Sequence, residues 1–138
     1  MRQPADHASH TVVVFSHDAA IRERIRFAVG RRPAADVGRI EYVECATSAE
    51  VIGEIDAGGI DLAILDGEAR PTGGMGICRQ LKFEVTACPP VLVVLGRRDD
   101  RWLAKWSLAD ATVTHPIDPV EAAAAVAGLL RAGAVVAG

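Results

Sequence analysis

The sequence predicts an α/β fold in which a five-stranded parallel sheet is doubly wound, with helices on both faces, into a three-layer sandwich. Two observations predict this fold. Five short apolar runs alternate with five segments of helical periodicity, and no linker or internal repeat interrupts the alternation. Right-handed crossovers join parallel strands, so the helices form the two outer layers. A chain of 138 residues, half of them apolar, is the size of one such domain.

The predicted strands are short and mostly apolar. The first covers residues 11–15, a continuous run of Thr, Val and Phe that suits a strand buried on both faces of a parallel sheet. The others are predicted at 40–45, at 62–65 ending in Asp66, at 91–95 and at 111–114. The run at 91–95 (VLVVL) is the plainest buried strand, whereas the third stops abruptly at a carboxylate.

Helices are predicted between the strands, at 19–30, 48–58, 75–83, 99–108 and 119–131. In the first, Ile21, Ile25 and Val29 recur at helical spacing, after a turn whose Asp18 can cap the helix. We expect Ser48 to cap the second helix. We also expect a flexible leader at 1–10, a single domain at 11–132 and a tail at 133–138.

Charge and composition exclude several classes of protein. A formal net charge of −3 argues against a nucleic-acid-binding domain, which is normally basic. No apolar run approaches the roughly 20 residues that span a bilayer, and the polar start of the chain is not a signal peptide. Three cysteines without metal-like spacing suit reduced thiols, so we expect a cytoplasmic protein.

The segment at 61–74 (DLAILDGEARPTGG) is the strongest functional signal in the chain. Ligands bind at the carboxyl ends of the strands in sheets of this type, and Asp66 ends the third strand. The next helix is expected to begin at about Met75, too far away for Asp66 to be its cap. We therefore interpret Asp66 as a functional residue.

The chain resembles the receiver domain of two-component response regulators over residues 11–131. The matching pieces are 12–22, 61–76, 90–100 and 114–119, and they include the pattern Asp-Leu-x-x-x-Asp-x-x-x-x-Pro that ends at Pro71. In that family the Asp ending the third strand attacks a phosphohistidine and becomes an acyl phosphate. The resemblance therefore implies that Asp66 is at the phosphoacceptor position and that the domain acts in phosphorelay signalling.

Other positions depart from the family pattern. Two adjacent acids that hold magnesium in the family are replaced by Ser16 and His17. The Thr or Ser that ends the fourth strand is matched to Leu95, the aromatic switch residue to Thr112, and the Lys before a proline to His115. The resemblance is therefore to an atypical receiver domain.

These replacements weaken the expected phosphoryl transfer, which depends on neutralising charge on the phosphoryl oxygens. Magnesium prefers oxygen ligands, so a site with His17 is weakened; if it binds, we expect Asp66 and the backbone carbonyl of Glu68 to hold it. Asp18 or Glu68 can also reach a metal, and Arg97, Arg98 or His115 can face a phosphate. A zinc-like set of His17, Asp66 and Cys45 is a weaker alternative.

Trp102 and Trp106 are one turn apart on the predicted fourth helix. Receivers use this helix, with the fifth strand and fifth helix, to contact partners or to dimerise. We expect one Trp to be in the core and the other to serve as an exposed anchor, since Trp is favoured at interface hot spots.

We therefore predict a stand-alone, atypical response regulator receiver that acts through protein contacts, with weak or no phosphorylation of Asp66. Its partner would be a histidine kinase or another signalling protein, and a homodimer through the fourth helix, fifth strand and fifth helix is an option. No direct nucleic-acid or membrane contact is expected, and no enzymatic activity beyond self-phosphorylation. The alternatives are a functional phosphoacceptor with a substituted metal site and a small flavodoxin-like cofactor-binding protein or enzyme.

Overall fold

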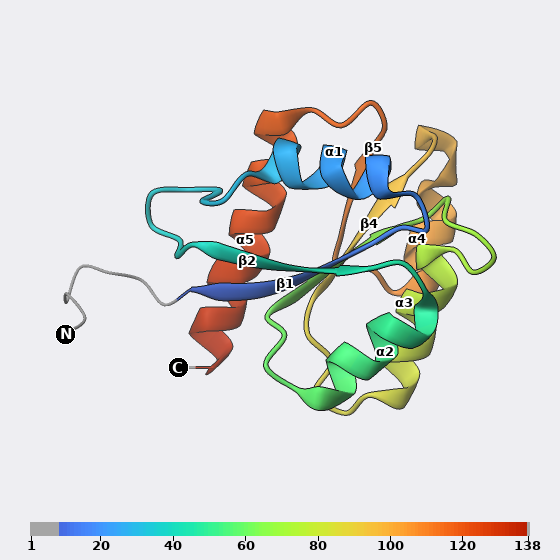
Figure 1. Ribbon diagram of the computed structural model, residues 1–138, viewed down its shortest axis with the longest axis horizontal. Helices are drawn as coiled ribbons and strands as arrows, with labels where there is room; N and C mark the ends of the chain where they lie inside the picture. Colours follow the sequence, from blue (N-terminus) through green and yellow to red (C-terminus); the bar gives the residue numbers. More distant parts are fainter. Residues whose placement is uncertain (1–8, 138) are drawn as a thin grey trace.

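A five-stranded sheet with the strand order β2-β1-β3-β4-β5 forms the middle of the molecule (Figure 1). The computed structural model describes residues 9–137. The strands are β1 (His10–Phe15), β2 (Ile40–Cys45), β3 (Leu62–Asp66), β4 (Val91–Leu95) and β5 (Ala111–Thr114), and every pairing is parallel. The order of the strands reverses between β1 and β3, so the crevice at their carboxyl ends is where a ligand site is expected.

Helices cover both faces of the sheet, as the sequence predicts (Figure 1). The helices are α1 (Ala19–Val29), α2 (Ser48–Ala57), α3 (Gly74–Glu84), α4 (Arg101–Ser107) and α5 (Pro119–Ala137), and a 3-10 turn, η1 (Arg98–Asp100), precedes α4. Helices α1 and α5 pack on one face, while α2, α3 and α4 pack on the other.

Successive strand residues alternate between two cores because a strand has a period of two residues. Val12 and Ile64 face the core beneath α1 and α5, whereas Val13 and Leu65 face the core beneath α2, α3 and α4. All five residues of β3 are buried, because both faces of this central strand are covered. Burying one such side chain is worth roughly 1.5–3 kcal/mol, so the two cores hold the sheet edge in place.

Two expected element boundaries are wrong. The cap of α2 is Thr47, not Ser48: the Thr47 hydroxyl oxygen accepts the Glu50 backbone N–H at 3.1 Å. Helix α5 continues to Ala137, beyond residue 131, because the small residues that follow contain no proline to end it. Residues 1–8 of the predicted leader lie outside the described residues, as does Gly138 of the predicted tail, and His10 already belongs to β1.

The start of α3 lies directly against the end of β3, and glycine allows this approach. A Cβ atom at Gly74 would lie 2.7 Å from the Asp66 carbonyl oxygen and 2.8 Å from the Leu65 Cβ. The loop between Asp66 and α3 is therefore held close to the carboxyl edge of the sheet. Within residues 9–137, no helix combines the length and apolar character needed to cross a membrane.

Candidate functional site

Asp66 lies at the end of the central strand and is 3% exposed. Both of its carboxylate oxygens have hydrogen-bond partners within the protein. Oδ1 accepts the Glu68 backbone N–H at 2.8 Å, and Oδ2 accepts the Ser16 hydroxyl at 2.8 Å. Hydrogen bonds to a carboxylate are among the stronger ones in proteins, so these two donors offset the cost of burying Asp66.

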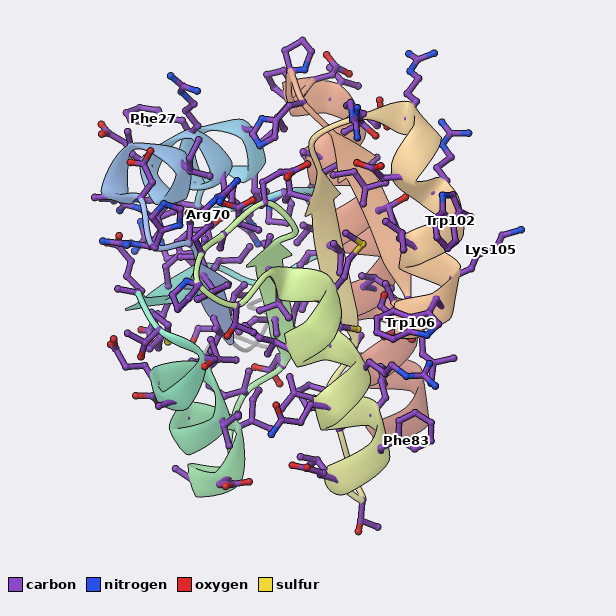
Figure 2. The ribbon with its side chains drawn as sticks, turned by 90° about the vertical axis from the view of Figure 1, so that its right-hand side faces the viewer. Phe27, Arg70, Phe83, Trp102, Lys105 and Trp106 are labelled. Atoms are coloured by element: carbon purple, nitrogen blue, oxygen red, sulfur yellow. The ribbon has the colours of Figure 1, made fainter. Side chains whose placement is uncertain are left out.

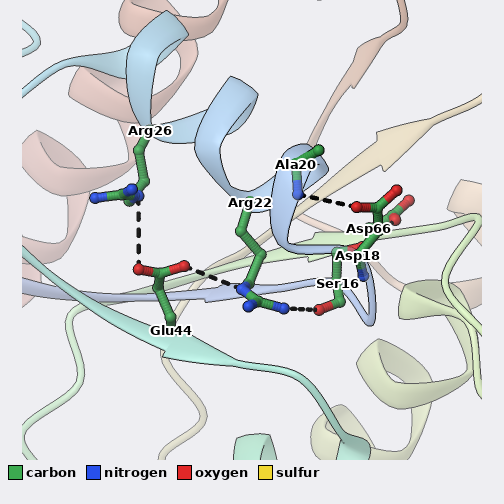
Figure 3. A network of polar contacts seen from close by, with 7 residues as sticks. All are labelled: Ser16, Asp18, Ala20, Arg22, Arg26, Glu44 and Asp66. Carbon is green, nitrogen blue, oxygen red and sulfur yellow. Dashed lines mark hydrogen bonds and ion pairs between the residues drawn. The ribbon is translucent and has the colours of Figure 1, made fainter.

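Ser16 follows β1 and is fully buried. Its hydroxyl donates to Asp66 and accepts the Asp18 backbone N–H at 3.1 Å. The Ser16 carbonyl accepts Nη1 of Arg22 at 2.6 Å, and Nε of Arg22 contacts Glu44 on β2 at 3.0 Å (Figure 3). Ser16 is thus fixed from three sides, and its hydroxyl proton is directed at Asp66.

His17 ties the turn after β1 to the loop after β3. Its Nδ1 accepts the Arg70 backbone N–H at 2.9 Å, so in the neutral ring the proton is on Nε2. A ring that accepts through Nδ1 and carries its proton on Nε2 has no lone pair directed at a cation. His17 therefore positions the loop above Asp66 and does not act as a metal ligand in this arrangement.

Glu68 fills the corner between the ends of β3 and β4. Its carboxylate lies against Gly96, and a Cβ atom at position 96 would collide with Oε1 of Glu68. Asp66 and Val94 are register partners, so their side chains point to the same face of the sheet. Position 96, two residues after Val94, is consequently the β4-end position on the Asp66 face.

The structure places the side chains of Leu95 and Thr112, both predicted as pocket positions, on the face of the sheet opposite to Asp66. Leu95 is fully buried in the core beneath α2, α3 and α4, on the face opposite to Asp66. Thr112 is the register partner of Val93, whose side chain belongs to that same core.

An open pocket lies above Asp66 on the α1 side of the sheet. It is lined by His17, Asp18, Ile21, Arg24, Asp66, Glu68, His115 and Pro116. His115, Asp18 and Glu68 thus gather around Asp66 as the sequence predicts. Arg24 was not predicted at the site; it lies three residues after Ile21, on the same side of α1, and both line the pocket.

The two predicted arginines after β4 do not line this pocket. The Arg97 side chain is 78% exposed and lies 3.8 Å from Asp100, and Arg98 is exposed at the start of η1. Cys45 is buried in the core beneath α2, which argues against the zinc-like alternative. Among the described residues, no group of three or more His, Cys, Asp or Glu side chains is arranged to hold a metal ion.

The side chains present therefore do not fit a magnesium ion in the way that the family pattern implies. Magnesium prefers carboxylate oxygens, and neither Ser16 nor His17 has one. The Ser16 hydroxyl also donates its proton to Asp66, and Nδ1 of His17 accepts a backbone N–H. The arrangement holds Asp66 in one orientation and surrounds it with two further carboxylates.

Solved structures of receiver domains have this fold. The chain superimposes on a Francisella response regulator receiver domain with a TM-score of 0.72 and 18% identity, covering 88% of this chain and 97% of that one. The receiver domain of the response regulator TorR gives a TM-score of 0.68 and 23% identity, covering 88% and 96%. These likenesses show a flavodoxin-like α/β fold of the receiver type.

Sequence similarity then identifies the family. A response regulatory protein of Mycobacterium tuberculosis is 54% identical over 123 residues, which are 89% of this chain and 92% of that protein. The chain belongs to the response regulator family, and its described residues form one receiver domain. No protein-family model matches the chain. Receiver domains of response regulators are signalling modules that interact with kinases or other proteins, and they are not typical enzymes.

Proposed function

We propose that this receiver signals through protein contacts without phosphorylation of Asp66. The observation that carries the proposal is the pair of hydrogen bonds on Asp66, in which Ser16 stands where the family pattern has a metal-binding acid. Each missing group that stabilises charge on a transferred phosphoryl costs roughly 10²–10³-fold in rate. Without the metal acids and the lysine, self-phosphorylation would fall by several such factors.

Glu68 supports the same proposal. Its carboxylate lies against Gly96 at the end of β4, next to Leu95, the position that the family pattern matches to a hydroxyl contacting the phosphoryl oxygens. A negative charge at this corner repels an incoming phosphoryl group instead of stabilising it. The replaced metal acids and the charge of Glu68 are thus two independent observations that support the proposal.

We further propose a cytoplasmic role in phosphorelay signalling, with a histidine kinase or another signalling protein as the partner. A homodimer through α4, β5 and α5 is an alternative to such a partner, and sedimentation of the chain distinguishes the two. If magnesium binds at all, Asp66 and the Glu68 carbonyl remain its candidate ligands. These points go beyond the family assignment and are open to direct measurement.

The test is the intact mass of the protein after incubation with acetyl phosphate and magnesium or manganese. We expect no gain of a phosphoryl group. A gain of one phosphoryl that disappears in Asp66→Asn would overturn the proposal and favour a functional phosphoacceptor with a substituted metal site.

A restored variant serves as the positive control. It combines Ser16→Asp, His17→Asp, Leu95→Thr and His115→Lys, which restore the residues of the family pattern. It also includes Glu68→Ala, which removes the carboxylate that lies against Gly96 at the end of β4. We expect this variant to gain one phosphoryl group from acetyl phosphate, because the metal acids, the cation and the hydroxyl are then all present.

A further inference from the structure

Helix α4 exposes its largest side chains and buries its smallest. Trp102 is 66% exposed and Trp106 is 49% exposed, whereas the buried residues of this helix are Ala104 and Ser107. A helix that served only to cover the sheet would bury its tryptophans, because burial of large apolar surface drives folding. The expectation that one Trp belongs to the core is therefore wrong, and both are available to a partner.

The exposed aromatic surface continues from α4 onto α3. The Arg79 guanidinium lies 4.5 Å from the Trp106 ring centroid and 4.9 Å from that of Phe83, which is 68% exposed. Nη1 of Arg79 also donates to the Trp106 carbonyl oxygen at 2.5 Å. Phe83, Trp106 and Trp102 lie along one side of the molecule (Figure 2). Together with Arg79, which contacts two of them, they are here called the aromatic ridge.

Arg79 holds the ridge in a fixed arrangement before any partner arrives. Its cation–π contacts join Trp106 and Phe83 across two helices, and each such contact is worth roughly 0.5–1 kcal/mol at an exposed site. Ordering exposed side chains in advance reduces the entropy that binding has to overcome. The ridge is thus preorganised in the manner of a binding surface.

The ridge is bordered by positive charge. Arg101 and Lys105 are exposed on α4, and α4 contains no Asp or Glu. Two nearby acids are paired with cations: Asp110 contacts Lys82 Nζ at 2.6 Å, and Asp100, just before α4, lies 3.8 Å from Arg97 Nη2. Glu84 on α3 accepts a hydrogen bond from the neutral Gln80 amide at 3.2 Å and keeps its charge. In a chain with a formal net charge of −3, this local excess of positive charge favours an acidic partner.

We propose that the aromatic ridge docks an acidic amphipathic helix of a partner protein. The apolar side chains of that helix would pack on Trp102, Trp106 and Phe83, and its flanking carboxylates would pair with Arg101 and Lys105. A helix suits the ridge because the two tryptophans are one turn apart and form a row. The inference rests on the proposed signalling through protein contacts and names the chemistry of the partner.

A second copy of the chain fits the ridge less well. Homodimers usually have two-fold symmetry, so the same patch would face itself across the interface. That contact would bring Arg101 and Lys105 of the two copies together, and like charges oppose association. The experiment therefore has to distinguish self-association through the ridge from the binding of a partner helix.

Intrinsic fluorescence provides the test, because both tryptophans of the chain are on the ridge. The probe is a synthetic 18-residue helical peptide with Leu at helical i, i+3, i+4 and i+7 spacing and Glu on the flanking positions. We expect a saturable blue shift of the tryptophan emission of the full chain. Binding should weaken by about tenfold when salt rises from 50 mM to 500 mM, since exposed charges are screened.

Matched variants and peptides identify the surface. Arg101→Glu combined with Lys105→Glu should weaken binding at least about tenfold, as should Phe83→Ala. Phe27→Ala should leave binding unchanged, because Phe27 is 78% exposed on α1 and lies away from the ridge. A peptide with Lys in place of Glu should not bind, and urea unfolding of each variant checks that it is folded.

Three results would overturn the inference: no blue shift with the acidic peptide, equal binding of the Lys peptide, or equal losses in Phe27→Ala and Phe83→Ala. A dimer seen by sedimentation that Trp102→Ala abolishes would also overturn it, in favour of a second copy. These results are separable from the phosphorylation test, because acetyl phosphate labelling addresses Asp66 and does not involve the ridge.

Discussion

At the Asp66 pocket the polar groups are buried and hydrogen-bonded to one another, whereas at the aromatic ridge the largest apolar groups face solvent. Asp66 has two donors from within the chain, and Ser16 is held on three sides. Trp102 and Phe83, in contrast, are about two-thirds exposed. The difference indicates that the pocket is satisfied internally, while the ridge retains surface that only another molecule can cover.

The largest expected effect is a loss of stability on substituting Ile77, and Phe83 on the same helix provides the comparison. Ile77→Ala on the buried side of α3 should lower the free energy of unfolding by about 2–5 kcal/mol, because Ile77 is fully buried. Phe83→Ala on the exposed side should lower it by less than about 1 kcal/mol. Urea unfolding measures both, and a loss of similar size at Phe83 would show that the ridge serves the fold.

The buried thiols should be slow to react. Burial raises the pKa of Cys45 and of Cys78 from the usual 9.0 to about 11. At pH 8 the thiolate fraction is then lower by about 100-fold, so alkylation by iodoacetamide should be about 100-fold slower in the folded protein than in urea. Mass spectrometry of labelled peptides follows each thiol; equal rates in both states would contradict the prediction.

The same raised pKa values predict an alkaline loss of stability. Between about pH 9 and 11 the folded protein keeps thiol protons that the unfolded chain releases. The contribution of the neutral thiols to stability is complete below pH 9 and declines as the pH rises toward 11. Cys45→Ser combined with Cys78→Ser should flatten this part of the stability profile.

The smallest of these effects concerns Ser16. Ser16→Ala removes one donor from buried Asp66, so the free energy of unfolding should fall by about 1–3 kcal/mol at pH 7. Ser9→Ala, at an exposed position just before β1, is the control and should change it by less than about 0.5 kcal/mol. An unchanged stability in Ser16→Ala would mean that water replaces the hydroxyl and that the pocket is not closed to solvent at this point.

The order of the elements and the place of Asp66 were predictable from local patterns. Apolar runs such as 91–95 have the length and β-branched composition typical of a buried strand, and the helices between them show the period of 3.6 residues. A carboxylate that ends the central run must lie at the sheet edge. These features depend on neighbours in the chain, so the sequence alone carries them.

Which side chains face Asp66 was decided by tertiary structure. Side chains alternate between the two faces of a strand, so at the end of β4 Gly96 lies on the Asp66 face and Leu95 on the opposite face. A shift of one residue in the expected strand would exchange the two faces. The contact of His17 with Arg70 joins residues 53 positions apart, which no local pattern encodes.

At the aromatic ridge, too, the sequence determined one part and the tertiary structure the other. The sequence determined that two tryptophans occupy one helix, but their exposure depends on how α4 is placed against its neighbours. The contact between α4 and the rest of the fold is made through Ala104 and Ser107, and Arg79 from α3 then stacks on Trp106. Local periodicity specifies which residues share a face of a helix, whereas only packing against the rest of the chain decides which face is buried.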